Sequence, residues 1–267
     1  MLKSRRQHAR RVDKSLIKTP AEIEIMREAG KIARHVCIMA KETVRPGMTT
    51  GQLEDLAEDY ITQNGATSPC LGYTPAGHPP YPAWTCISVN EEIVHGIPGQ
   101  KVIQSGDIVT MDCCVELKGF VADTALTFAV GTIRPDVDRL LKVTEEALNI
   151  GISNALPGNT TGDVGWSIQK FAESNGYSVV RELHGHGVGR SMHESALDVP
   201  NYGRPGSGTL LETGMTFAIE PMLNMGKKDI RTLRDGWTIV TADGKISAHF
   251  EHTIAIGERN ALILTRD

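Results

Sequence analysis

The sequence has no long apolar run, no excess of positive charge and few cysteines. None of its apolar stretches approaches the roughly 20 residues of a membrane-spanning helix, and no secretory signal is recognisable at its start. The formal net charge of -4 over 267 residues argues against a nucleic-acid binder defined by bulk charge. These absences favour a cytoplasmic globular protein that does not enter a membrane.

The five cysteines are too few and too scattered for a disulfide scaffold, and none forms a CxxC pair. We therefore expect reduced thiols. Cys113 and Cys114 are adjacent in a predicted strand, so their side chains should point to opposite faces and should not bind one metal ion together.

Residues 1–16 are predicted to form a basic, mobile tail. Six lysines and arginines within residues 3–14 stand against a single acid, Asp13. A tail of this kind can be a solvated extension without a partner, a contact for RNA or the ribosome, or an organelle-targeting segment. Residues 17–267 are expected to form one folded domain.

Two halves of the remaining chain carry the same pattern. The motif at 46–51 (PGMTTG) recurs at 157–162 (PGNTTG), and each copy lies between a long amphipathic helix and a shorter one. Downstream, 105–112 resembles 213–220, where a turn glycine opens an apolar strand that ends in a carboxylate. Unless these short matches are coincidental, the chain is an α+β protein whose halves, about 19–131 and 132–257, share one core.

Asp112 and Asp123 are predicted to lie on one face of a hairpin. If Lys118-Gly119 is a two-residue turn, Cys114 faces Asp123 and Asp112 faces Ala125. The two aspartates are then diagonal neighbours, with backbones roughly 7 to 8 Å apart. Carboxylates placed this way among apolar residues repel each other unless a cation lies between them, and a divalent metal is the simplest such cation.

The second half repeats this arrangement with Glu220 and Glu251. Glu220 ends an apolar strand, and Glu251 lies in a strand predicted at 247–254. That strand is expected to form a second hairpin with 237–241 through a turn at 242–245. Duplication would then bring four carboxylates together at the interface of the halves.

The stretch 183–194 (LHGHGVGRSMHE) supplies three histidines and three glycines. Imidazole is the commonest protein metal ligand, and glycine lets backbone approach closely. Four carboxylates and one histidine suit a pair of Mn, Fe, Co or Zn ions bridged by carboxylates and water, which implies hydrolysis. For any single carboxylate, a salt bridge or a turn position is the alternative.

These residues make the chain closely resemble the type I methionine aminopeptidases of the pita-bread fold. The resemblance runs from about Ile17 to the C-terminus and implies two pseudo-symmetric halves, each of antiparallel strands covered by helices. It includes the Asp112/Asp123 hairpin and the motifs at 89–98 (VNEEIVHGIP), 185–189 (GHGVG), 192–194 (MHE), 219–222 (IEPM) and 250–253 (FEHT).

The resemblance also assigns roles to individual residues. It implies a dinuclear metal site with the ligands Asp112, Asp123, His186, Glu220 and Glu251. A water activated by the two metals would attack the peptide carbonyl, and Glu220 would relay a proton to the leaving amine. His95 and His193 would bind the substrate and stabilise the tetrahedral intermediate. His184 is expected to be structural and dispensable for chemistry.

The methionine side chain would occupy a small apolar pocket. By resemblance, this pocket is lined by Cys70, Tyr73, Tyr81, Cys86, Met192 and Trp237, although each residue singly could be part of the core. The chain departs from the family at two points. Met192 stands where an aromatic residue is frequent, and the connection at 74–80 (TPAGHPP) is longer than usual.

The expected function is removal of the initiator methionine from nascent proteins whose second residue is small, by a cytoplasmic monomer. One alternative is a proline-specific peptidase of the same fold, although those typically carry an extra N-terminal domain. The other is a pita-bread binding protein without catalysis, although such relatives lose metal ligands that are all present here.

Overall fold

The computed structural model describes residues 12–266, so most of the basic tail lies outside the described residues. Lys14–Leu16 forms a short 3-10 helix (η1), and Leu16 is buried in the core, so the folded part includes the last residues assigned to the tail. Between residues 12 and 266, no helix combines the length and apolar character that crossing a membrane requires.

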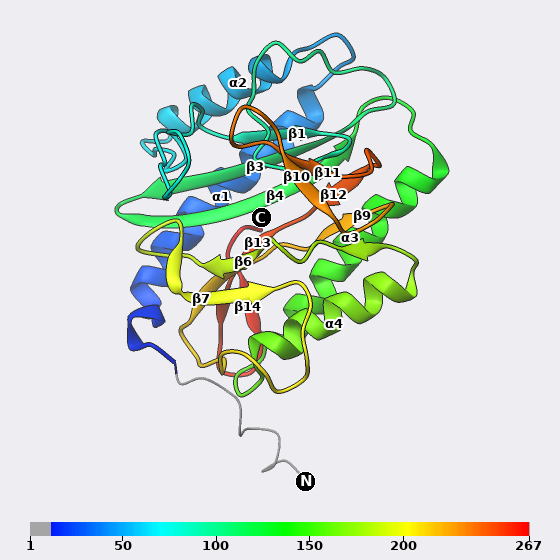
Figure 1. The fold of residues 1–267 in the computed structure, drawn as a ribbon. Helices are drawn as coiled ribbons and strands as arrows, with labels where there is room; N and C mark the ends of the chain where they lie inside the picture. Colours follow the sequence, from blue (N-terminus) through cyan, green and yellow to red (C-terminus); the bar gives the residue numbers. More distant parts are fainter. Residues whose placement is uncertain (1–11, 267) are drawn as a thin grey trace.

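Twice along the chain, a pair of α-helices is followed by a run of strands (Figure 1). The helices are α1 (Pro20–Thr43), α2 (Thr50–Gln63), α3 (Pro135–Asn154) and α4 (Thr161–Ser174). The strands of the first half are β1 (Cys86–Val89), β2 (Glu92–Val94), β3 (Ile108–Leu117) and β4 (Phe120–Ala129). Those of the second half are β5 (Ser178–Val179), β6 (His184–Gly187), β7 (Glu194–Pro200), β8 (Thr216–Ile219), β9 (Met222–Asn224), β10 (Ile230–Thr232), β11 (Ile239–Thr241), β12 (Ser247–His249), β13 (His252–Ile256) and β14 (Ala261–Ile263).

Helix α1 begins at the capping box predicted from the sequence. The Thr19 side chain accepts a hydrogen bond from the Glu22 N–H, and the Glu22 carboxylate accepts one from the Thr19 N–H. The apolar face of α1 packs against β3 and β4, and in Figure 1 the helix runs behind these strands. That buried face comprises Met26, Ala29, Gly30, Ala33, Val36, Cys37 and Ala40.

The second half repeats the first, as the duplicated motifs predicted. Helices α2 and α4 both have 14 residues, and both begin with a capping box whose N-cap is a threonine, Thr49 or Thr160. Each of these threonines also forms an isolated antiparallel bridge, Thr49 with Val102 and Thr160 with Leu210. The same short motif therefore ties each helix start to an equivalent segment of its own half.

The strands form antiparallel sheets that the helices cover on one side. One sheet has the order β1-β3-β4 and another the order β14-β13-β8-β6-β7, while β10-β11-β2 and β12-β9-β5 form smaller sheets. Helices α1 and α3 pack onto these strands, and α4 packs onto α3. A single apolar cluster spans both halves and includes Val36, Met111, Leu140 and Phe217. The predicted α+β architecture of two pseudo-symmetric halves is confirmed.

The β3–β4 hairpin has the predicted register. Cys114 pairs with Asp123 and Asp112 pairs with Ala125. Lys118 and Gly119 both have positive φ, 52° and 79°, as the tightest hairpin turn requires. The two adjacent thiols separate as predicted, since Cys113 belongs to the main core and Cys114 to a second apolar cluster, and all five cysteines are free.

The second predicted hairpin is wrong. Strand β11 pairs with β10 and β2, and β12 pairs with β9, so β11 and β12 do not pair with each other. The reason is that residues 90–91 lie between them. Thr241 N–H donates to the Glu91 carbonyl, and Ser247 N–H donates to the Asn90 carbonyl, both at 3.0 Å.

The predicted continuous strand at 247–254 is also interrupted. It divides at residues 250–251 into β12, which pairs with β9, and β13, which pairs with β8. The Glu251 N–H instead donates to the Ala125 carbonyl of β4 at 3.0 Å, which bends the chain toward the first half. Glu251 consequently lies where the strand changes sheet.

Candidate active site

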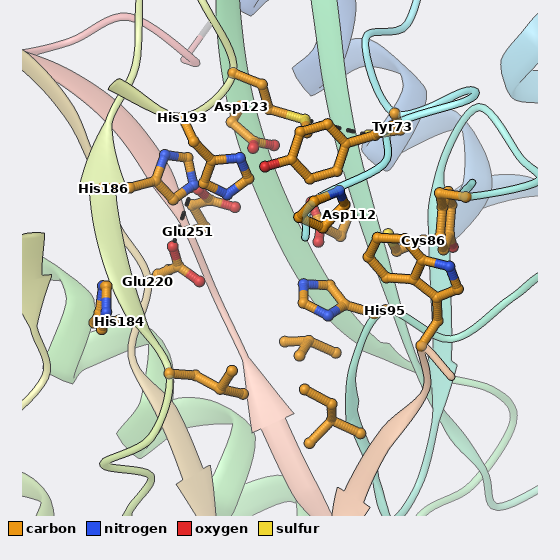
Figure 2. A pocket seen from close by; sticks show the side chains of 18 of the residues that line it. Tyr73, Cys86, His95, Asp112, Asp123, His184, His186, His193, Glu220 and Glu251 are labelled. Carbon is orange, nitrogen blue, oxygen red and sulfur yellow. Dashed lines mark hydrogen bonds and ion pairs between the residues drawn. The ribbon is translucent and has the colours of Figure 1, made fainter. Parts of the chain in front are cut away.

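One cavity of about 340 Å³ lies where the strands of the two halves meet (Figure 2). The structure brings every candidate site residue named from the sequence to the wall of this cavity. These residues are Cys70, Tyr73, Tyr81, Cys86, His95, Asp112, Asp123, His186, Met192, His193, Glu220, Trp237 and Glu251. Strands and connections from both halves of the chain therefore converge on one site.

Three of these side chains form a cluster that could hold a metal ion. Asp123, His186 and Glu251 each offer one ligand atom, and these atoms all lie within 4.8 Å of one another. The His186 Nε2 lies 3.6 Å from Glu220 Oε1. Asp123 Oδ1 and Glu251 Oε1 are buried without a hydrogen-bond partner. Buried carboxylate oxygens without partners are costly, so the donor set fits a divalent cation.

The carboxyl groups of the cluster hinder one another's ionisation. Burial first and the charge of Asp123 second raise the pKa values of Asp112, Glu220 and Glu251. Burial likewise raises the pKa of Asp123 to about 7. Because a bound cation favours the ionised forms, this arrangement is suited to metal binding and unfavourable without it.

Glu220 and Glu251 reach the cavity because both lie at interruptions between strands. Pro221, which has no N–H, separates β8 from β9, and the bend at Glu251 separates β12 from β13. His252 pairs with Ile219 across β13 and β8, so the two glutamates stand next to each other at the ends of neighbouring strands. The second half thus contributes its carboxylates without the predicted second hairpin.

Glycines on either side of His186 allow β6 to pass close to its neighbours. A Cβ at Gly185 would collide with the Ala218 carbonyl oxygen, and one at Gly187 would lie 2.9 Å from the Glu194 carbonyl oxygen. His186 Nδ1 lies 3.1 Å from the Gly187 carbonyl oxygen, which orients Nε2 toward the acidic cluster. Burial lowers the pKa of His186 to about 3, so the ring is neutral, the form that binds metals.

His95 follows β2 in a left-handed conformation that is uncommon for a residue with a side chain. Its φ is 58°, and the next residue must be glycine because a Cβ at Gly96 would collide with the Ile87 carbonyl oxygen. This tight turn directs the His95 ring into the cavity (Figure 2). Burial lowers the pKa of His95 to about 4, so its imidazole is neutral near pH 7.

His193 lies beside the candidate metal-binding cluster. Its ring centroid is 4.0 Å from that of His186 and 5.4 Å from that of Tyr73. The next residue, Glu194, forms an ion pair with the buried ammonium group of Lys18. The segment that carries His193 is therefore anchored to the N-terminal part of the fold. His184 also lines the cavity, but it is exposed and lies 3.8 Å from Asp198.

The apolar part of the cavity is built from aromatic and sulfur-containing side chains. Tyr81 meets Trp237 edge to face at 5.1 Å between centroids, and its hydroxyl donates to the Gly96 carbonyl at 3.0 Å. The Cys70 thiol lies 3.8 Å from the Met192 sulfur. Met192 thus lines the pocket at the position where the family frequently has an aromatic residue.

The long connection at 74–80 covers the outer side of Trp237. The indole Nε1–H donates to the Pro79 carbonyl at 3.0 Å, and the His78 ring centroid lies 5.0 Å from that of Trp237. His78 Nδ1 also lies 2.9 Å from the Gly236 carbonyl oxygen. The added residues therefore extend the pocket wall and hold Trp237, with Tyr81 still lining the cavity.

Sequence reasoning missed His78 and His249. Tyr73 and Tyr81 flank His78, and only the unusual length of this connection marked it. His249 lies in an apolar segment two residues before Glu251, and burial lowers its pKa to about 3. The available signal for His249 was its position two residues before Glu251, because side chains two residues apart in a strand lie on the same face.

The fold and the carboxylate-histidine cluster define a metallopeptidase site. The profile of Metallopeptidase family M24 matches residues 24–258, and the chain belongs to this family. It is 48% identical over 250 residues to a methionine aminopeptidase of Clostridium perfringens, covering 94% of this chain and 98% of the relative. It is 45% identical over 251 residues to methionine aminopeptidase 1 of Bacillus subtilis, covering 94% and 99%.

The same relationship holds in three dimensions. A crystal structure of methionine aminopeptidase from Rickettsia prowazekii superposes with a TM-score of 0.90 at 39% identity, covering 94% of this chain and 99% of that one. Within family M24, the chain is thus one of the methionine aminopeptidases.

Proposed function

We propose that this protein removes the initiator methionine from nascent polypeptides whose second residue is small. The observation that carries the proposal is the contact between a carboxylate-histidine cluster and an apolar pocket of sulfur and aromatic side chains within one cavity. Such a pocket suits a thioether side chain, and the cluster lies where the adjoining peptide bond would be.

The cofactors in this proposal are two divalent ions, with Co, Mn, Fe and Zn as candidates. Asp112, Asp123, His186, Glu220 and Glu251 would hold them, which accounts for the unpartnered oxygens of Asp123 and Glu251. When bound, such ions lower the pKa of water and polarise a carbonyl group.

The remaining steps belong to the protein's own side chains. Neutral His95 and His193 bind the peptide carbonyl oxygen, and their N–H groups stabilise the negative charge that develops on it. Ionised Glu220 accepts a proton from the attacking water and delivers it to the leaving amine nitrogen. Trp237, Tyr81 and Met192 exclude water from the methionine side chain.

The arrangement of the whole chain belongs to the same proposal. Residues 17–267 would form a single catalytic domain of two repeats, about 19–131 and 132–257, in a cytoplasmic monomer. The basic residues 3–14 would contact the ribosome or RNA by charge, near the emerging substrate. A variant that lacks residues 1–11 should retain turnover of a short peptide and lose ribosome binding in a sedimentation assay.

The decisive experiment compares Met-Ala-Ser with an Xaa-Pro peptide. Chelator-stripped protein should cleave neither, and addition of Co²⁺, Mn²⁺, Fe²⁺ or Zn²⁺ in turn should restore release of methionine from Met-Ala-Ser alone. Preferential cleavage of the Xaa-Pro peptide would favour a prolidase-like enzyme. Metal binding without turnover of either peptide would favour a binding protein.

A further inference from the structure

His249, which no role described so far requires, has a buried side chain directed at Glu220. It ends β12 and is only 1% exposed. Neither ring nitrogen has a hydrogen-bond partner among the described residues, although both are buried. Nε2 lies 3.7 Å from Glu220 Oε2, slightly beyond hydrogen-bond distance.

The position of the imidazole is fixed by its backbone. The Thr127 hydroxyl donates to the His249 carbonyl at 2.5 Å, and the His249 N–H donates to the Thr127 hydroxyl oxygen at 3.0 Å. Both residues are buried, and Thr127 belongs to β4 of the first half. The ring is therefore anchored at the junction of the two halves, so the unpartnered nitrogens are not a consequence of a loose segment.

Glu220 lies between two imidazoles, one on each oxygen. His186 Nε2 is 3.6 Å from Oε1, and His249 Nε2 is 3.7 Å from Oε2. The two histidines differ in one respect. His186 Nδ1 faces the Gly187 carbonyl oxygen, whereas both nitrogens of His249 are free of partners. Buried polar atoms without partners are rare, and each such atom calls for a specific explanation.

We propose that His249 is a positioning residue whose Nε2–H donates to Glu220 Oε2 and leaves Oε1 to face the metal ions. This inference rests on the proposed function, because it assumes that Glu220 binds metal. A carboxylate that ligates a metal through one oxygen needs a donor on the other to fix its orientation. A neutral imidazole supplies this donor without adding charge to the cluster.

The hydrogen bond also bears on proton delivery. Glu220 is the residue that would carry the proton to the leaving amine, so its orientation determines whether the proton reaches the nitrogen. A small change in the Glu220 torsion angles would bring Oε2 within hydrogen-bond distance of Nε2. The effect of His249 should consequently appear in kcat more than in KM.

The test compares His249→Leu with His249→Gln in chelator-stripped protein, with Co²⁺ as the probe. Calorimetric titration with Co²⁺ alone, thermal unfolding without metal, and turnover of Met-Ala-Ser are measured. His249→Leu should bind Co²⁺ about tenfold more weakly and have a lower kcat at nearly unchanged KM. Its metal-free form should unfold at the same or a higher temperature, because two unpartnered polar atoms are removed. His249→Gln, which retains an N–H donor, should recover most of the Co²⁺ affinity.

Three results would overturn the inference. His249→Leu could bind Co²⁺ and turn over peptide like the wild type, or its metal-free form could unfold at a markedly lower temperature, which would indicate a purely structural role. His249→Gln could also be as impaired as His249→Leu, which would make the imidazole a ligand itself. The matched control is His252→Gln, because that half-buried ring has a hydrogen-bond partner, the Thr265 hydroxyl at 2.8 Å, and does not face Glu220. Co²⁺ affinity is measured without peptide. A wild-type protein that binds Co²⁺ but does not cleave Met-Ala-Ser would therefore contradict the proposed function and not the role of His249.

Discussion

The Thr253 hydroxyl forms two hydrogen bonds with the backbone of Asp123. It accepts one from the Asp123 N–H and donates one to the Asp123 carbonyl, each at 2.8 Å. Asp123 belongs to β4 of the first half and Thr253 to β13 of the second. The Thr124 hydroxyl adds a bond to the Glu251 carbonyl at 2.7 Å. Threonine side chains therefore join the halves at the residues that carry the candidate metal ligands.

Thr253→Val should weaken both the fold and the metal site. The substitution retains shape but leaves the N–H and carbonyl of Asp123 buried without these partners, which costs about 1–3 kcal/mol. Urea unfolding of the metal-free protein should show this loss, and Co²⁺ affinity should fall as well. Thr213→Val, at an exposed hydroxyl that bonds to the Gly257 carbonyl, is the control. Equal stability of the two variants would contradict the bridging role of Thr253.

His186→Ala and His184→Ala should have opposite consequences, although only one residue separates these histidines. His186 belongs to the candidate metal group, whereas the exposed His184 lies beside Asp198 and does not belong to it. His186→Ala should lose Co²⁺ binding and lower kcat about 100-fold or more, in line with the loss of an essential group. His184→Ala should remain within about threefold of the wild type, since a surface contact of this kind contributes little. Metal analysis of the dialysed variants measures the difference. Equal loss of metal in both variants would show that His186 is not the distinguishing ligand.

His95→Ala and His193→Ala should separate turnover from metal content. Both rings line the cavity without belonging to the group of three ligand atoms. Loss of either N–H donor to the developing oxyanion should reduce kcat/KM for Met-Ala-Ser about 100- to 1,000-fold. Metal content should remain at the wild-type level. Near-normal turnover in either variant would remove that histidine from the mechanism.

Local sequence signals predicted the part of the site that one half contains. The Lys118-Gly119 turn requires positive φ at both positions, and the two-residue period of a strand then fixes which side chains share a face. The relation of Asp112 to Asp123 therefore followed from the sequence. The repeated motifs predicted that Glu220 and Glu251 would join them, and the assignment of roles depended on family resemblance.

Features that depend on distant segments could not be predicted in this way. The pairing of β11 failed because residues 90–91, far earlier in the chain, lie between β11 and β12. The contact of Pro79 with Trp237 likewise joins segments with no local relation. The direction of the His249 ring depends on where Glu220 lies, which the pattern of its own strand does not contain.

Metal binding should strengthen as the pH rises toward 7. Asp123 has a pKa of about 7 without metal, so it is mostly protonated below that pH and must release its proton to bind an ion. Co²⁺ affinity should fall about tenfold per pH unit below 7 for each proton released. His186, with a pKa of about 3, adds no proton in this range. Titrations between pH 5.5 and 8 in matched buffers measure the slope, and a Co²⁺ affinity that does not change over this range would contradict the raised pKa of Asp123.

The 74–80 connection should act on substrate binding more than on chemistry. His78→Ala removes both the ring contact with Trp237 and the bond to the Gly236 carbonyl, while the metal cluster is untouched. An aromatic contact contributes about 0.5–1.5 kcal/mol, so KM for Met-Ala-Ser should rise about two- to tenfold with kcat nearly constant. His35→Ala, which alters an exposed ring stacked on Tyr60, should leave KM unchanged. If kcat fell and KM did not, the connection would influence the reacting groups directly, and His78 would have to be placed with His95 rather than with the pocket wall.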